Sequence, residues 1–578
     1  MPLCLAVLLA WALSGALGLR WSRPLSFGGD HLFLLLHGRL FLDWPDILRN
    51  PHLGFPGAID LLAFPFTDLT QRVVQAAATL ATGSVMRGAY LYVMATIVAN
   101  TAAAYLALVV FTGRGWHAVT GSVAFALLPF FISRIGGHDY LAAYHAAPLA
   151  FVLLHHVARA AGPGALARDP VAWGCVAVIA TSGFYFSLFA LMLLGFGGVA
   201  LAVLRRSARP LLPALAAAGA VSVILGVVLL AFVLHAMDMR AAGQGDPFPP
   251  RAFHEQVLYG TRIADTLRLA DAVATPAMQQ YGAWAGQREG TDFWPGPLLS
   301  MFALCACLLG PLVLARRRGA APPAGRHEIT SVLVAWLIFC LLFSVPYGLG
   351  MVMNVLVSPV LRAQNRIAPF FAMAAILLAI WAWRIPTAWI VARAGPARGA
   401  VLAAIGLAAL AALNAAQGMG GLARRQAHLL GSPDYHAEIA SLDRVLATAQ
   451  ESGAIRILQL PIVSWPEQPP IGGFDPYWHL RPYIRSAPGS PFRWSYGMTM
   501  GAPEFLELRA IGGLPDRAAA TRRIACLGFD AVLLERRAFT PDQVAAWDAA
   551  LQGSGAPMIH GDDRRRFYRL PPVAGTCG

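Results

Sequence analysis

Long apolar runs separated by short polar segments dominate the first 416 residues of the chain. They cover residues 3–19, 88–112, 117–134, 139–158, 171–204, 210–236, 296–315, 329–346, 366–383 and 400–416. Because about 20 apolar residues cross a bilayer as a helix, the run over 171–204 is too long for one crossing, and we split it at Ser182-Gly183-Phe184-Tyr185. The pattern predicts an α-helical polytopic membrane protein with roughly 11 transmembrane helices.

Two mixed segments, 20–87 and 237–295, form large loops between the apolar runs. In the first, Leu, Phe and Trp recur at helical spacing between Gly and Pro, which predicts one or two amphipathic helices lying on the membrane surface. We expect both loops on the outer side of the membrane, attached to a transmembrane domain over 1–416.

After residue 416 the pattern changes to that of a small α/β domain over 417–578. Ser432-Pro433 and Thr540-Pro541 each combine a capping residue with a first-turn proline and so predict helix starts. Three apolar stretches predict strands, namely IRILQLPIV, FDAVLLE and RRFYRL. A further helix is expected over about 515–527.

Composition supports a membrane protein, because 57% of the residues are hydrophobic and only 13% are charged. The net charge is +14, and the arginines sit mostly at the ends of the apolar runs, as in a membrane protein, so we reject a nucleic-acid partner. The inner-loop arginines are Arg114, Arg159, Arg168, Arg205, Arg206, Arg209, Arg316, Arg317, Arg318, Arg326, Arg384, Arg393 and Arg398. The positive-inside rule then predicts a multi-pass protein of the bacterial inner (cytoplasmic) membrane, with the first loop and the C-terminal domain extracytoplasmic.

The cysteines show no metal-binding spacing. Five lie in apolar segments, and the other two, Cys526 and Cys577, lie in the C-terminal domain. An extracytoplasmic location would allow these two to pair, and the sequence leaves both the paired and the free state open.

Asp30 follows the first apolar run closely and is the first candidate for chemistry. A carboxylate beside the membrane can act as the base for an acceptor hydroxyl, but Asp is also a preferred cap for a helix starting at His31. Four other acids of the same loop are alternatives for the base, namely Asp43, Asp46, Asp60 and Asp68. Asp30 ranks first because it lies nearest the membrane.

Arg362 and Arg366 are the exceptions to the scarcity of arginine in the short outer loops, and they flank Asn365 just before a span. The planar guanidinium binds phosphate well, so we expect a lipid phosphate here, with snorkelling to lipid headgroups as the alternative. In the loop 237–295, Glu255 and Tyr259 fit a substrate-contact surface or a solvated helix with its own ion pairs.

Several motifs in a fixed order resemble the GT-C superfamily of polyprenyl-phosphate-sugar-dependent glycosyltransferases, in particular large bacterial membrane proteins of that type. The motifs are Asp30, Asn50-Pro51-His52-Leu53-Gly54-Phe55-Pro56-Gly57, Phe64-Pro65-Phe66-Thr67-Asp68, Gly137-His138-Asp139-Tyr140, Tyr259-Gly260 and Arg362-Ala363-Gln364-Asn365-Arg366-Ile367. The resemblance implies a GT-C-like fold, Asp30 as the catalytic base and Asp139 as an assisting acid. His138-Asp139 also fits an ordinary polar pair at the membrane surface. With one acid in that loop, we expect no metal and no other cofactor.

The function expected from these features is an inverting glycosyltransferase. It would take a sugar from a polyprenyl-phosphate donor, held by Arg362, Asn365 and Arg366, to an extracytoplasmic glycan, lipid or protein. His31, His138, Glu255 and Tyr259 would contact the substrates, with the lipid of the membrane as a further partner. Four aromatic residues of the C-terminal domain would either bind an acceptor glycan or form its core, namely Trp465, Tyr477, Trp478 and Trp494.

The alternatives are a transporter or flippase of a lipid-linked sugar and a non-catalytic assembly protein of the cell envelope. Transporters carry charged or broken helices at the middle of the membrane, whereas the acids of this chain avoid the span centres and gather in outer loops. This distribution favours the enzyme.

Overall fold

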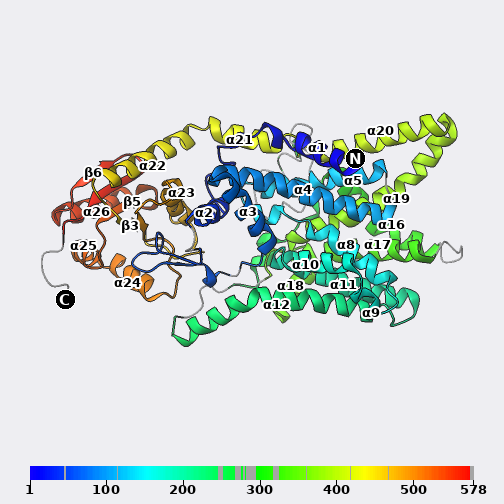
Figure 1. Ribbon diagram of the computed structural model, residues 1–578, viewed down its shortest axis with the longest axis horizontal. Helices are drawn as coiled ribbons and strands as arrows, with labels where there is room; N and C mark the ends of the chain where they lie inside the picture. Colours follow the sequence, from blue (N-terminus) through cyan, green and yellow to red (C-terminus); the bar gives the residue numbers. More distant parts are fainter. Residues whose placement is uncertain are drawn as a thin grey trace.

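The computed structural model describes residues 1–43, 47–64, 66–113, 115–244, 251–266, 275–277, 280, 295–316, 324–359, 361–416, 418–466 and 468–572. Its long helices gather at one end of an elongated molecule and a β-sheet with shorter helices lies at the other (Figure 1). Between the two ends lie α2 (His31–Leu42) and α3 (Leu69–Thr82), which come from the first loop.

Seven helical stretches among the described residues are long and apolar enough to cross a membrane. They are α4 (Val85–Thr112), α5 with α6 (Trp116–Ala126, Pro129–Arg134), α11 (Phe184–Arg205), α12 (Leu211–Ala241), most of α17 (Ala324–Ser344), η5 with α19 (Gln364–Ile367, Ala368–Ala394) and α20 (Pro396–Ala415). Shorter apolar helices are α1 (Pro2–Ser14), α2, α8 (Ala146–Arg159), α10 (Pro170–Ala180) and the first part of α16 (Pro297–Arg316). A multi-pass helical protein is therefore confirmed, whereas the count of 11 spans is not.

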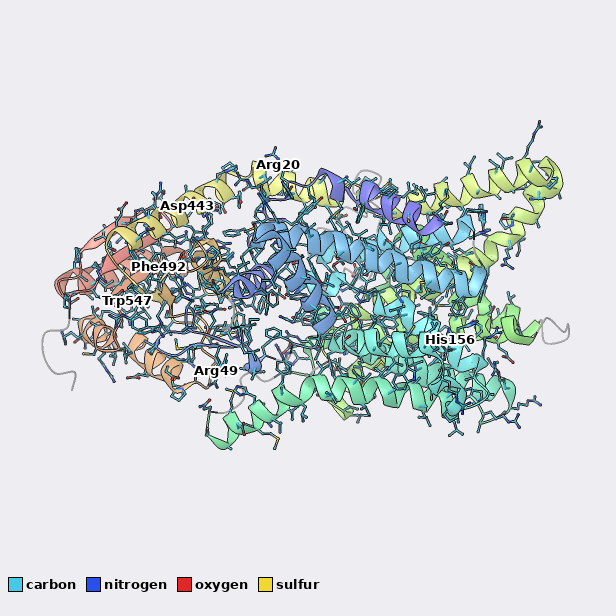
Figure 2. The ribbon with its side chains drawn as sticks, in the orientation of Figure 1. Arg20, Arg49, His156, Asp443, Phe492 and Trp547 are labelled. Atoms are coloured by element: carbon cyan, nitrogen blue, oxygen red, sulfur yellow. The ribbon has the colours of Figure 1, made fainter. Side chains whose placement is uncertain are left out.

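The first expected span is shorter than its apolar run. In the run over 3–19 the α-helix ends before Gly15, whose φ of 81° is in the left-handed region, and one 3-10 turn, η1 (Ala16–Gly18), follows. The 13 residues of α1 are about 20 Å long, less than the thickness of about 30 Å of the hydrocarbon core. The end of α1 lies close to the start of α21 (Gly421–Gly431), since a Cβ at Gly15 would lie 3.0 Å from the Cα of Gly420. The side chain of Gln426, on α21, accepts the backbone N–H of Arg20 and donates to the carbonyl of Arg20. Arg20 lies beside α21 in Figure 2.

Other breaks in the apolar runs determine where polar groups lie. The run over 139–158 divides into α7 (Asp139–Ala142) and α8, so Asp139 lies on a separate short turn. The split expected in 171–204 is confirmed, because α10 ends at Ala180 and α11 begins at Phe184. On the side opposite the sheet lie α9 (Pro163–Ala167) and the neighbouring His156 (Figures 1 and 2).

The two helices of the first loop differ in their surroundings. The amphipathic α3 buries polar residues such as Gln71, Gln75 and Thr79 and exposes apolar ones, as a helix lying against lipid would. In contrast, α2 is buried on every side from His31 to Leu40, so of these two helices α3 alone has the exposed apolar side expected of a helix on the membrane surface. Its apolar surface packs partly against a domain more than four hundred residues later in the chain, which its local pattern does not reveal.

The C-terminal part contains a five-stranded sheet of order β4-β3-β5-β7-β6. The strands are β3 (Arg456–Leu460), β4 (Arg493–Trp494), β5 (Ala531–Glu535), β6 (Met558–Gly561) and β7 (Arg565–Arg569). β3 is parallel to β4 and β5, and β7 is antiparallel to β5 and β6. The helices are α22 (Pro433–Glu451), η6 (Pro476–Leu480), α23 (Arg481–Arg485), α24 (Pro503–Gly512), α25 (Arg517–Cys526), η7 (Arg536–Ala538) and α26 (Pro541–Gly553). All the expected helices and strands of this C-terminal sheet domain are present.

The first loop extends the sheet domain. Leu53 forms a parallel bridge with Trp494, and the Trp494 backbone N–H donates to the carbonyl of His52 at 2.8 Å. A short hairpin of β1 (Arg49–Asn50) and β2 (Ile59–Asp60) follows the same edge, then η2 (Leu61–Ala63). Phe27, Leu32 and Leu53 share one apolar core with residues of the sheet domain. The first loop and the sheet domain therefore pack against each other. The domain boundary at residue 416 remains a prediction.

Candidate active site

Asp30 is paired with His138. It occupies the residue before α2, but its side chain makes no capping hydrogen bond. Its Oδ2 lies instead 2.5 Å from Nδ1 of His138, and the two side chains are 38% and 33% exposed. A carboxylate that is half exposed and oriented by an imidazole has the geometry of a general base.

A second aspartate–histidine pair lies beside the first and runs the other way. Nδ1 of His31 lies 2.8 Å from Oδ2 of Asp139, and both side chains are 1% exposed. The other oxygen of Asp139 accepts the backbone N–H of Gly136 at 2.9 Å. The segments 30–31 and 138–139 are thus joined by two reciprocal pairs, of which Asp30–His138 faces outward and His31–Asp139 is buried.

The sheet domain covers the other side of Asp30. A Cβ at Gly28 would lie 3.4 Å from Nε1 of Trp478 and 3.6 Å from a terminal nitrogen of Arg481. Asp475, at the start of η6, faces Asp30. Burial raises the pKa of Asp475, Asp30 adds to this, and hydrogen bonds and Arg481 oppose it. The sequence shows Asp475 only as a cap before Pro476, so its place in the site was missed.

The predicted phosphate residues form a second cluster around η5. Nη1 of Arg362 lies 2.5 Å from Oε2 of Glu255, on α13 (Glu255–Tyr259), and its Cζ lies 5.2 Å from the ring centroid of Tyr259. The Cζ of Arg366 lies 4.5 Å from the ring centroid of Tyr185, and Asn365 is fully buried. Glu255 therefore pairs across elements and not within its own helix.

The electrostatics of this second cluster keep its carboxylate ionised. Partial burial alone would raise the pKa of Glu255, but the hydrogen bonds from Arg362 and from the Ala252 backbone N–H outweigh it and lower the pKa. An ionised Glu255 is thus a standing counter-ion of Arg362, and it competes with any phosphate that this arginine binds.

The residues between the first cluster and the second form a row in which side-chain contacts alternate with neighbours along the chain. Tyr140 follows Asp139, and the Cζ of Arg72 lies 4.8 Å from the Tyr140 ring centroid. Arg72 pairs with Asp68 at 3.3 Å, and a Cβ at Gly183 would lie 3.3 Å from Oδ1 of Asp68. Tyr185, the ring beneath Arg366, is two residues beyond Gly183 in the chain.

Arg72 was missed because it occupies the polar side of an amphipathic helix, where arginine is unremarkable in sequence. Its Cζ lies 3.8 Å from the ring centroid of Phe66, so it packs between two aromatic rings. Burial raises the pKa of Asp68, and Arg72 lowers it in part. This ion pair occupies the middle of the row and can interact with a bound phosphate or sugar.

The other acids of the first loop have structural contacts. Asp43 pairs with Arg39 at 3.2 Å and accepts the hydroxyl of Tyr483 at 2.6 Å. Asp60 lies between Arg49 and His235, at 3.6 and 3.0 Å. Asp46 is outside the described residues.

The aromatic residues of the sheet domain divide into two kinds. Trp465 and Trp494 are 1% and 0% exposed and belong to its core, so for these two residues the core alternative holds. Tyr477 and Trp478 are partly exposed. Cys526 is in a disulfide, whereas Cys577 is outside the described residues.

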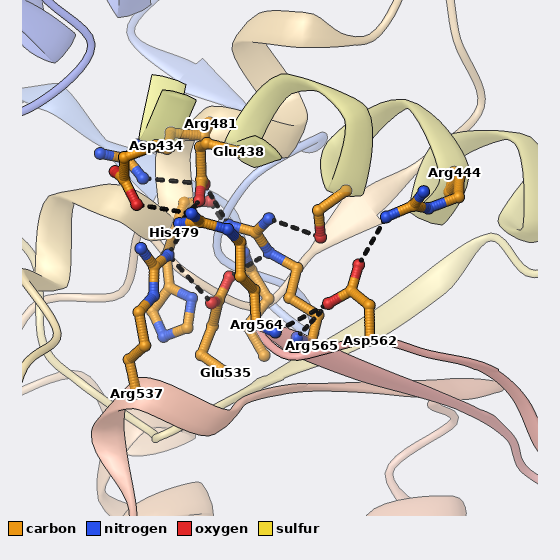
Figure 3. A network of polar contacts seen from close by, with 12 residues as sticks. Asp434, Glu438, Arg444, His479, Arg481, Glu535, Arg537, Asp562, Arg564 and Arg565 are labelled. Carbon is orange, nitrogen blue, oxygen red and sulfur yellow. Dashed lines mark hydrogen bonds and ion pairs between the residues drawn. The ribbon is translucent and has the colours of Figure 1, made fainter. Parts of the chain in front are cut away.

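A buried ionic network of the sheet domain lies next to Trp478 (Figure 3). Glu438 pairs with Arg481 at 2.8 Å, with Arg537 at 3.1 Å and also with Arg565, which holds Glu535 at 2.6 Å. Two of these arginines, Arg481 and Arg537, each lie 4.2 Å from the ring centroid of Trp478. The network therefore fixes the indole that packs against Gly28.

Comparison with known proteins gives a fold but no close relative. No protein-family model and no curated protein matches the chain. The solved structure of the arabinofuranosyltransferase AftD from Mycobacteria is similar over 99% of this chain and 40% of its own, with 15% identity and a TM-score of 0.53. The chain thus spans less than half the length of AftD, and the likeness establishes the fold alone.

Two other solved structures have lower scores. They are the archaeal oligosaccharyltransferase AglB from Archaeoglobus fulgidus, in complex with an inhibitory peptide and a dolichol-phosphate (13% identity, 96% and 71% of the two chains, TM-score 0.47), and ArnT from Cupriavidus metallidurans, bound to undecaprenyl phosphate (13%, 99% and 98%, 0.46). Because the TM-scores of these two structures are below 0.5, the fold assignment depends on AftD. The likeness to AftD agrees with the fold that the motifs imply, and the chain shares the fold of that part of AftD.

Proposed function

We propose that the protein is a glycosyltransferase that moves a sugar from a polyprenyl-phosphate donor to a hydroxyl group of an extracytoplasmic glycan, lipid or protein. One observation carries this proposal. The half-exposed Asp30, paired with His138, lies at one end of a row of side chains that ends at Arg366 and its neighbour Arg362. A base and a cationic phosphate site are the two groups that this reaction needs.

In the proposed reaction Asp30 accepts the proton of the acceptor hydroxyl as its oxygen attacks the anomeric carbon. The bond from that carbon to the phosphate oxygen breaks on the opposite face, so the configuration inverts and the lipid phosphate leaves. Arg362, Asn365 and Arg366 stabilise the negative charge on the leaving phosphate. His138 orients Asp30, while the buried pair of His31 and Asp139 holds the two segments together.

Glu255 and Tyr259 complete the phosphate site by positioning Arg362. The guanidinium groups supply the positive charge that a metal ion supplies in other phosphate sites, so the proposed mechanism is metal-independent. We further propose that the site and the sheet domain are on the extracytoplasmic side of a bacterial inner membrane, as the distribution of arginine predicts.

The test is release of undecaprenyl phosphate by the full-length protein in nanodiscs. Radiolabelled undecaprenyl-phosphate hexoses and pentoses are supplied with a lipid and glycan extract of bacterial envelopes. We expect release from at least one donor, and a loss of roughly 100-fold to 10,000-fold in Asp30→Asn, as for removal of a general base. Asp443→Asn, an exposed partner of Arg485 outside the site, is the control.

Two results would overturn the proposal. Full activity of a stable Asp30→Asn protein would remove the base from the mechanism. Movement of an intact donor across the bilayer without release of undecaprenyl phosphate would instead identify a flippase.

A further inference from the structure

A cavity of about 550 Å³ lies where three separate parts of the chain meet. Its walls come from the hairpin of β1 and β2, from the last turns of α12, and from the start of α24 with the residues before it. Figure 1 shows the end of α12 reaching past the other long helices towards α24. Sites that bind small molecules usually have a volume of roughly 300–1,000 Å³, so this cavity is large enough for a ligand.

The cavity lies outside the hydrocarbon core of the membrane. The 31 residues of α12 make a helix about 46 Å long, whereas about 20 residues are enough to cross the core. Arginines at 205, 206 and 209 precede this helix, so in the proposed orientation its start lies at the inner membrane surface. His235 and Asp238, which line the cavity, then lie beyond the core on the side of the sheet domain. A ligand of this cavity therefore comes from the aqueous phase.

The side chains that line the cavity give it an excess of negative charge. Asp60 is paired with Arg49 at 3.6 Å and with His235 at 3.0 Å. Asp238 and Glu504 also line the cavity, and within the part of the chain that the structure describes their side chains form no hydrogen bond or ion pair. A phosphate, or the carboxylate of an acidic sugar, would be repelled by these two acids. The cavity thus differs from the second cluster, which fits a phosphate.

The position of Asp238 is unfavourable for the helix that carries it. Asp238 lies in the last turn of α12, where the free carbonyl groups carry a partial negative charge. Acids stabilise the start of a helix and destabilise its end. The contribution of Asp238 is therefore not to the stability of α12, and its presence in the wall of a cavity points to a ligand.

The polar and apolar groups of the cavity fit a sugar. A carboxylate accepts hydrogen bonds from hydroxyl and amino groups, which are the donors of a glycan. Thr499 adds a hydroxyl group that donates or accepts. Met239 and Met498 supply an adaptable apolar surface for the C–H groups of a sugar ring. A ligand with many hydroxyl groups and no negative charge matches this lining.

The cavity is close to the row of side chains between the two clusters. The ring centroid of Phe232 lies 6.5 Å from that of Phe66, which packs against Arg72 of that row. His235 is three residues beyond Phe232, which is about one turn of α12. A glycan in the cavity is thus about one helical turn from the row, where the proposed transfer takes place.

We propose that this cavity binds the acceptor, and that the acceptor is a glycan without acidic groups, either neutral or amino-bearing. The inference rests on the proposed function and narrows it, because that function left a glycan, a lipid or a protein open. Asp238 and Glu504 accept hydrogen bonds from the sugar hydroxyls, while Asp60 stays balanced by Arg49.

The test is the binding of four trisaccharides to the full-length protein in nanodiscs, measured by saturation-transfer NMR without any donor. The trimers of N-acetylglucosamine and of mannose are neutral, the trimer of glucosamine carries amino groups, and the trimer of galacturonic acid is acidic. At least one of the first three should bind, and the acidic trimer should not. Binding of none of the four, or of the acidic trimer as tightly as the others, would overturn the inference.

Two variants connect the binding to the cavity. Asp238→Ala and Glu504→Ala each remove a charge-assisted acceptor and should weaken the binding of the trimer roughly 10-fold to 100-fold. The matched control is Glu507→Ala, because Glu507 is an exposed acid of α24 that does not line the cavity. Unchanged binding in both cavity variants, or an equal loss in the control, would overturn the inference.

Thermal melts exclude unfolding as the cause of a loss of binding. Asp238→Ala removes an unfavourable charge from the end of α12, so its melting temperature should equal or exceed that of the wild type. A variant that is this stable and still binds the trimer as the wild type does would contradict a ligand role for Asp238.

The release of undecaprenyl phosphate separates this inference from the proposed function. A protein that binds a trimer through Asp238 and Glu504, but releases no undecaprenyl phosphate from any donor, would overturn only the enzymatic role. Equal release by the wild type, Asp238→Ala and Glu504→Ala at limiting envelope extract would overturn only the acceptor site.

Discussion

The pair of Glu255 and Arg362 allows a prediction in which two substitutions have opposite effects. In the proposed function Arg362 binds the donor phosphate, yet Glu255 already occupies that guanidinium at 2.5 Å. Because its pKa is lowered, Glu255 stays ionised near neutral pH. Arg362→Gln removes a ligand of the phosphate, whereas Glu255→Gln removes an anion that competes for the same arginine.

The magnitudes follow from the geometry. One charge-assisted hydrogen bond contributes about 1.5–3 kcal/mol, so Arg362→Gln should weaken the binding of undecaprenyl phosphate by roughly 10-fold to 100-fold. Two anions about 6 Å apart at an effective dielectric constant of about 20 repel by about 3 kcal/mol. Solvent screens this repulsion, because the side chains of Glu255 and Arg362 are 19% and 23% exposed, and Glu255 also orients the guanidinium of Arg362. These effects offset most of the repulsion. We therefore expect Glu255→Gln to improve the binding free energy of undecaprenyl phosphate by about 1 kcal/mol, or about fivefold in Kd.

The assay is the Kd of undecaprenyl phosphate for full-length protein in detergent, by native mass spectrometry. A second ion pair between elements, Arg205 with Glu328 at 2.9 Å, supplies the control variant Glu328→Gln. If Glu255→Gln and Arg362→Gln weaken binding equally, the pair is a structural unit and the competition argument is refuted.

Four further predictions concern stability and metal dependence. Arg565→Met removes the fully buried counter-ion that Glu438 and Glu535 share, and Arg537 remains beside both. It should lower the free energy of unfolding by about 3 kcal/mol in thermal melts, whereas a loss below about 1 kcal/mol would contradict it. Burial alone would raise the pKa of Glu438, but Arg565 and the neighbouring arginines lower it from 4.5 to about 2. Stability present above pH 4.5 should therefore be lost as the pH falls towards 2, and melts of Glu438→Gln should show a flatter acid limb. Thr540→Ala removes the capping box of α26 and should cost about 1 kcal/mol in denaturant titrations. EDTA should leave the release of undecaprenyl phosphate unchanged.

Local sequence patterns predicted most elements of the fold. The break at Ser182-Gly183, the helix starts at Ser432 and Thr540 and the strands of the sheet depend on spacing within a few residues. The two site clusters were also predictable in part, because polar residues stand out beside apolar runs. Glu255, Tyr259 and Arg362 were named separately, and the structure brings them together.

The unpredicted features depend on contacts between distant parts of the chain. The apolar pattern of α2 fits a helix lying on lipid as well as one buried by a protein domain. Asp475 resembles an ordinary cap, and only the packing of the sheet domain against the first loop brings it near Asp30. Arg72 becomes notable because Phe66 and Tyr140 enclose it, the latter from a different element.

The central claim is that the clusters around Asp30 and Arg362 serve one reaction. The most direct measurement is a cryo-EM structure of the full-length protein in nanodiscs with undecaprenyl phosphate. The account predicts a phosphate that contacts Arg362 and Arg366, with the Asp30 carboxylate about one sugar ring away. A phosphate bound elsewhere, or an Asp30 carboxylate that faces away from it, would contradict the account.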